Sequence, residues 1–82
     1  MKENVLNILQ RINPKITDGV NLIDMGIIES FEVVKVTMEI EEFFDIEIDA
    51  KDYYAANFQT VDAITALVEK YVNEKNKSKE RM

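Results

Sequence analysis

The chain contains no cysteine, histidine or tryptophan, and only one proline and two glycines in 82 residues. Without cysteine it can form no disulfide, thiolate zinc site or iron–sulfur cluster. Without histidine it lacks the commonest general base and the commonest transition-metal ligand. No apolar run approaches the roughly 20 residues of a transmembrane helix, and the N-terminus has no signal-peptide core. The composition argues against most self-contained enzymes, and we expect a cytoplasmic protein without a membrane span.

Positive charge is also scarce, because sixteen acidic residues face ten basic ones and the net charge is −6. Nucleic acids and anionic membranes require clustered lysine and arginine, so both are disfavoured as partners. The acids concentrate in residues 29–52, where nine carboxylates stand against two lysines, for a net charge of −7. Such a run can be a solvated helix face. On charge alone the solvated face is the favoured interpretation, and the alternative is a docking surface for basic partners, since complementary charge steers association.

Helical spacing of apolar residues marks the two ends of the chain. Residues 3–13 predict an amphipathic helix that ends before Pro14, because the residue before proline is pushed out of helical geometry. Thr60 is predicted to cap the last helix. Asp49 is predicted to cap a short helix near residues 50–56.

The middle segment, residues 30–44, fits two patterns. Its residues from Val34 to Glu41 alternate between apolar and polar, as a strand does. The same segment also carries an apolar stripe at helical spacing, and its length suits a helix better than a strand. Ser30 is a good N-cap residue, so the sequence favours a helix beginning there.

Together these elements predict an all-α fold, a small three-to-four-helix bundle with a long loop between helices 1 and 2. Residues 1–72 form the expected domain, and residues 73–82 are expected to be a polar, disordered tail. The loop of residues 14–29 should pack against the core through Ile16, Val20, Leu22, Ile23, Met25, Ile27 and Ile28. The expected core includes Val5, Ile8, Leu9, Ile12, Val33, Ile40, Phe44, Ile48, Ile64, Leu67 and Val68.

Two constellations that could carry chemistry fail on inspection. The run from Asp45 to Asp49 resembles the start of an EF-hand loop, but Ala50 replaces the required glycine and Ala56 the bidentate glutamate. No metal site is therefore predicted. Lys35 lies about 140° around the helix from Ser30, so the two residues make a poor nucleophile–base pair. No catalytic residue is predicted.

The residues around this serine are nevertheless distinctive. The segment from Asp24 to Val34 contains Gly26-Ile27-Ile28-Glu29-Ser30-Phe31, and Phe43-Phe44-Asp45-Ile46-Glu47-Ile48 follows it. This order resembles acyl carrier proteins over roughly residues 3–72, and it is similar also to D-alanyl carrier proteins. The resemblance implies an acyl-carrier type bundle in which Ser30 carries a covalent 4′-phosphopantetheine arm. It implies a carrier without enzymatic activity of its own.

The resemblance also implies that one flank of the second helix meets partner enzymes. Those partners would be a phosphopantetheinyl transferase and the enzymes that load or transfer acyl or aminoacyl groups. Acidic side chains would steer them and apolar ones would supply short-range contact. Met38 is expected to be partly buried as well. The residues expected on this surface are Glu29, Phe31, Glu32, Val34, Met38, Glu41 and Glu42.

Several alternatives remain open at this stage. Acyl carrier proteins usually have aspartate before the serine, where this chain has Glu29, and Lys35 replaces a common acid. The cargo can be an acyl group, in fatty-acid, polyketide or nonribosomal biosynthesis, or D-alanine or another amino acid. The chain can also be an unmodified carrier-like interaction module. We expect a monomer in every case.

Overall fold

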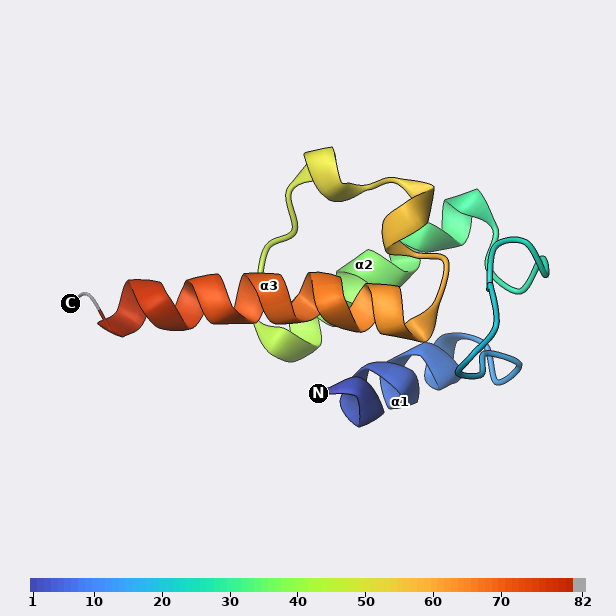
Figure 1. Ribbon diagram of the computed structural model, residues 1–82, viewed down its shortest axis with the longest axis horizontal. Helices are drawn as coiled ribbons and strands as arrows, with labels where there is room; N and C mark the ends of the chain where they lie inside the picture. Colours follow the sequence, from blue (N-terminus) through green and yellow to red (C-terminus); the bar gives the residue numbers. More distant parts are fainter. Residues whose placement is uncertain (81–82) are drawn as a thin grey trace.

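The computed structural model describes the backbone of residues 1–80 and the side chains of residues 1–29 and 31–76. In this part of the chain every regular element is helical, which confirms the expected all-α fold (Figure 1). The elements are the helices α1 (Lys2–Ile12), α2 (Ser30–Phe44) and α3 (Val61–Glu80), with two short 3₁₀ turns, η1 (Ala50–Asp52) and η2 (Ala55–Asn57), before α3. Within residues 1–80, no helix is long and apolar enough to span a membrane.

Helix α1 forms as the sequence predicts, to within one residue at each end. Its apolar stripe places Val5, Ile8 and Leu9 in the core. Asn13 adopts an extended conformation, with φ −147° and ψ 109°, and so ends the helix before Pro14.

Helix α2 settles the ambiguity between strand and helix in favour of the helix. Val36, Thr37 and Ile40 face the core, and the Thr37 hydroxyl donates to the Val33 carbonyl oxygen at 2.8 Å. This local bond satisfies a buried polar group that would otherwise be costly. The helix ends at Asp45, which adopts a left-handed conformation with φ 53°.

The long loop before α2 is fastened to the core by both backbone and side chains. Ile16, Leu22 and Ile28 are buried, as expected for a loop that packs on the bundle. The Leu22 amide donates to the Gln59 carbonyl oxygen at 2.6 Å, which joins the loop to the segment before α3. Met25 was expected to pack inward, but it is 67% exposed because it lies in a surface turn.

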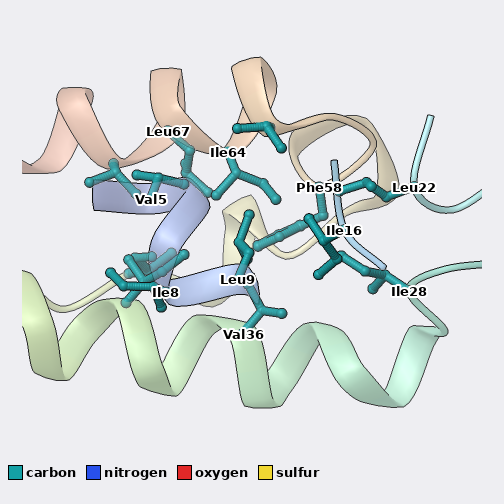
Figure 2. Close-up of a cluster of buried hydrophobic side chains, with 14 residues drawn as sticks. Val5, Ile8, Leu9, Ile16, Leu22, Ile28, Val36, Phe58, Ile64 and Leu67 are labelled. Carbon is teal, nitrogen blue, oxygen red and sulfur yellow. The ribbon is translucent and has the colours of Figure 1, made fainter. Parts of the chain in front are cut away.

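The core lies where α1, α2 and α3 meet (Figure 2). Eight of the eleven expected core residues are buried, and the other three, Ile12, Val33 and Phe44, are partly buried against the same cluster. The list of expected core residues omitted several that prove to be buried, in the loops, in the middle of α2 and at the start of α3. Those residues are Ile16, Leu22, Ile28, Val36, Phe58 and Val61.

The connection from α2 to α3 differs from the expected single short helix. Asp49 does cap η1, since its Oδ1 accepts from the Lys51 amide at 3.1 Å. The chain then leaves helical geometry at Tyr53, with φ −84° and ψ 65°, and turns again in η2. The expected cap of the last helix is confirmed, because Thr60 Oγ1 accepts from the Ala63 amide at 3.0 Å.

Helix α3 continues further than the sequence suggested. Residues 73–80 were expected to be a disordered tail, yet they extend α3 beyond the rest of the bundle (Figure 1). This stretch contains no proline or glycine to stop the helix. Lys75 also ties it to the end of α2, where its Nζ donates to the Asp45 carbonyl oxygen at 2.7 Å. The rest of the expected tail, residues 81–82, lies outside the described residues.

Candidate functional site at the start of helix α2

The first turn of α2 is built by glutamates on either side of Ser30. Glu29 is the N-cap, in an extended conformation with φ −94° and ψ 161°, and Ser30 is the first helical residue. The Glu29 amide donates to Glu32 Oε1 at 3.1 Å, which forms one half of a capping box. The expectation that Ser30 would be the N-cap is therefore wrong, because Glu32 supplies the acceptor that favours capping at Glu29. Ser30 keeps its place at the positive end of the helix dipole.

An apolar strip runs along α2 from this point. Phe31, Val34 and Met38 are 71%, 53% and 62% exposed, so none of them is part of the core. The spacing of three and four residues places them on one side of the helix. Met38 was expected to be partly buried, but this side faces away from the core face formed by Val36 and Ile40. We call these three residues the α2 strip.

The four acids expected at this site divide into two pairs. Glu32 and Glu41 are half-buried and hold the backbone: Glu32 accepts from the Glu29 amide, and Glu41 Oε2 accepts from the Ile48 amide at 2.9 Å. Glu29 and Glu42 are exposed. Glu41 therefore has a structural role that its sequence position did not reveal: its carboxylate stabilises the turn after α2.

This division predicts unequal effects on stability for two neighbouring substitutions. Glu41→Ala should lower the free energy of unfolding by about 1–2 kcal/mol, because the partly buried Ile48 amide loses a charged acceptor. Glu42→Ala should change it by less than about 0.5 kcal/mol, because an exposed side chain is removed. Urea unfolding of the two variants measures both values. Equal effects would contradict the assignment.

A small apolar groove lies beside the first turns of α2. It has a volume of about 190 Å³ and is lined by Ile23, Val33, Tyr53, Tyr54 and Ala55. Its walls come from the long loop, from α2 and from the segment that joins η1 to η2. Sequence reasoning missed the two tyrosines; the available signal was a pair of adjacent aromatic residues in the connection between α2 and α3.

Comparison with known proteins identifies the family of the chain. Residues 2–68 match the family described as "Phosphopantetheine attachment site". The chain belongs to this family. It is also 30% identical over 76 residues to a D-alanyl carrier protein of Lactobacillus helveticus (strain DPC 4571), with 89% of this chain and 96% of that protein aligned. No solved structure matches the chain significantly.

Membership makes the chain a carrier protein whose prosthetic group is a covalently attached 4′-phosphopantetheine. The group supplies a flexible arm that ends in a thiol, on which cargo is held as a thioester. The residues at the start of α2 suit such an attachment, because a serine there stands between the exposed residues Glu29 and Phe31. Among the described side chains, those of residues 1–29 and 31–76, no three or more acidic groups are placed so as to hold a metal ion.

Proposed function

We propose that Ser30 is the attachment point and that the protein carries acyl or aminoacyl groups as thioesters and presents them to partner enzymes. One observation carries this proposal: Ser30 is the only serine in the matched residues 2–68, and it is the first residue of α2. Because the transferase supplies the activating base, the poor alignment of Lys35 with Ser30 is no obstacle.

The attachment step places limited demands on the carrier itself. The Ser30 oxygen forms a phosphodiester with the phosphopantetheine phosphate of coenzyme A, and the pyrophosphate bond breaks. Adenosine bisphosphate leaves, and the hydroxyl proton passes to a base on the transferase. The resulting phosphate would lie near the positive end of the α2 dipole, although Glu29 and Glu32 oppose this attraction. No residue of the carrier is assigned a catalytic role.

The surface next to Ser30 has the composition of a transient docking site. The α2 strip offers exposed apolar side chains, and Glu29 and Glu42 add exposed negative charge. A partner with a basic, partly apolar face would be complementary to this combination. Glu32 and Glu41 add charge while they hold the backbone. We assign these residues, with Ser30, to the surface that the transferase and loading enzymes contact.

Charge neutralisation should therefore slow encounter with the transferase. The double variant Glu29→Gln, Glu42→Gln should show a several-fold lower kcat/KM for arm attachment at low salt, because steering weakens. The difference should shrink as ionic strength rises. The double variant Glu69→Gln, Glu74→Gln, which removes two exposed acids from α3, is the matched control and should behave as wild type. A loss that is independent of salt would contradict steering.

The relative in Lactobacillus helveticus favours an aminoacyl cargo, and D-alanine in particular. Loading experiments distinguish this from an acyl cargo. Holo-protein is incubated with ATP and either a D-alanine-activating ligase and D-alanine, or an acyl-activating ligase and a fatty acid. Mass spectrometry should show a D-alanyl adduct that hydroxylamine removes, as expected for a thioester. Efficient loading with the fatty acid alone would favour the acyl carrier instead.

A further inference from the structure

The connection between α2 and α3 is held by one buried carboxylate. Asp52 is 8% exposed, and its Oδ2 accepts a hydrogen bond from the Tyr71 hydroxyl of α3. Lys70 Nζ lies 3.5 Å from the same oxygen. The Asp49 amide donates to the Tyr71 oxygen at 3.1 Å, so both ends of η1 are tied to one phenol group.

The residues that follow are anchored again at their far end. The Asn57 Nδ2 donates to the Asp52 carbonyl oxygen at 2.9 Å, and Phe58 is fully buried. Between the anchors, Tyr53 and Tyr54 are 40% and 54% exposed. We call residues 53–57 the strap.

Open space lies on two sides of the strap. On one side is the apolar groove of about 190 Å³ against Val33 of α2. On the other is a hollow of about 270 Å³ against α3, where Ala63 and Ala66 leave room. Tyr54 lines both spaces. A segment with space on two sides and no α-helical hydrogen bonds of its own depends on its anchors for its position.

We propose that Tyr71 and Asp52 are positioning residues that fasten the strap and so set the width of the groove beside α2. When the bond between them opens, Tyr53 and Tyr54 move away from Val33 and the groove widens. The proposal concerns the unmodified chain and does not require Ser30 to carry an arm.

The charged groups around the hydrogen bond between Asp52 and Tyr71 determine the pH range in which it forms. The Tyr71 hydroxyl is the main cause of the lowered pKa of Asp52; Lys70 and Lys51 lower it further, and burial opposes them. Burial is the main cause of the raised pKa of Tyr71, and the hydrogen bond to Asp52 raises it further above the usual value of about 10. The hydrogen bond from the Asp49 amide lowers this pKa, and the negative charge of Asp49 raises it. A lowered acid pKa stabilises the folded state above about pH 4, and a raised phenol pKa stabilises it below about pH 10. The strap should stay fastened between these limits and loosen in acid.

Amide hydrogen exchange of the unmodified protein near pH 7 tests the proposal. Tyr71→Phe removes the hydroxyl and keeps the ring, and should speed exchange at the strap amides of Tyr54 and Asn57 about tenfold. Amides of α1 and of the middle of α2 should be unaffected. Tyr54→Phe is the matched control, because the described residues provide no hydrogen bond to its hydroxyl. Asp52→Asn keeps an acceptor oxygen and should restore much of the protection that Asp52→Ala removes.

A fluorescent probe reports the groove itself. Nile red, a neutral apolar dye, should bind Tyr71→Phe several-fold more tightly than wild type, while far-UV circular dichroism stays unchanged. Unchanged strap exchange in Tyr71→Phe would overturn the proposal. So would equal acceleration in α1 and α2, which would show a general loss of stability. If Tyr71→Phe fails to fold, the contrast between Asp52→Ala, which removes the acceptor, and Asp52→Asn, which keeps one, decides by the same two measurements.

Discussion

Replacement of Ser30 with alanine should abolish attachment of the phosphopantetheine arm. Wild-type protein incubated with coenzyme A and a phosphopantetheinyl transferase should gain the mass of one arm, and the Ser30→Ala protein should gain none. The expected effect is complete, because no other serine lies in the residues that match the family. Intact-protein mass spectrometry, followed by peptide mapping to the segment around Ser30, measures both results.

Ser78 provides the control for this experiment. It is the only other serine, and it lies in α3 outside the matched residues. Ser78→Ala should be modified as fast as wild type. Substitution at the first position of α2 should leave the helix intact, since alanine is a good helix former and Glu29 and Glu32 form the cap. A mass gain that persists in Ser30→Ala would place the arm elsewhere and remove the basis of the proposed function.

Replacement of Phe58 with alanine should largely unfold the protein. Phe58 is fully buried, and large-to-small substitutions of buried phenylalanine cost about 3–5 kcal/mol. A domain of this size has a stability of roughly 3–5 kcal/mol in total. The loss of one ring therefore approaches the whole free energy of unfolding. Thermal and urea denaturation followed by circular dichroism should show a greatly lowered or absent transition.

Phe43 gives a matched control with the same chemical change. It is 54% exposed and meets Phe44 edge-on, with the ring centroids 4.9 Å apart. Phe43→Ala should cost less than about 1 kcal/mol, because little buried area and one ring contact are lost. Comparable destabilisation by the two substitutions would show that the core is not centred where the structure places it.

The contrast between Phe43 and Phe58 shows where hydrophobic periodicity predicts burial and where it does not. Phe43 belongs to the apolar stripe of α2 by spacing, yet more than half of it is exposed. Phe58 lies in a short irregular connection where no period exists, and it is fully buried. Periodicity finds buried residues inside long helices, because one face of each must be covered. It gives no information in turns, where burial depends on which distant element lies opposite.

The candidate site shows the same division. The serine, its glutamate neighbours and the apolar residues of α2 were predicted as site residues from the resemblance that their order in the chain carries. The sequence did not show which acids bond to the backbone and which are exposed, because Glu41 and Glu42 are adjacent and chemically alike. Glu41 differs only because the returning chain brings the Ile48 amide within 2.9 Å of its carboxylate.

The sequence by itself determined the all-helical class, the position of α1 and α2, the start of α3, the acidic middle segment and the serine that starts α2. These properties follow from local spacing, capping residues and charge, which a few neighbouring residues specify. Tertiary structure alone decided that Met38 is exposed, that Asp52 is buried against Tyr71, and that the strap stands between two open spaces. Each of these depends on contact between residues far apart in the chain, and only the packed bundle brings such residues together.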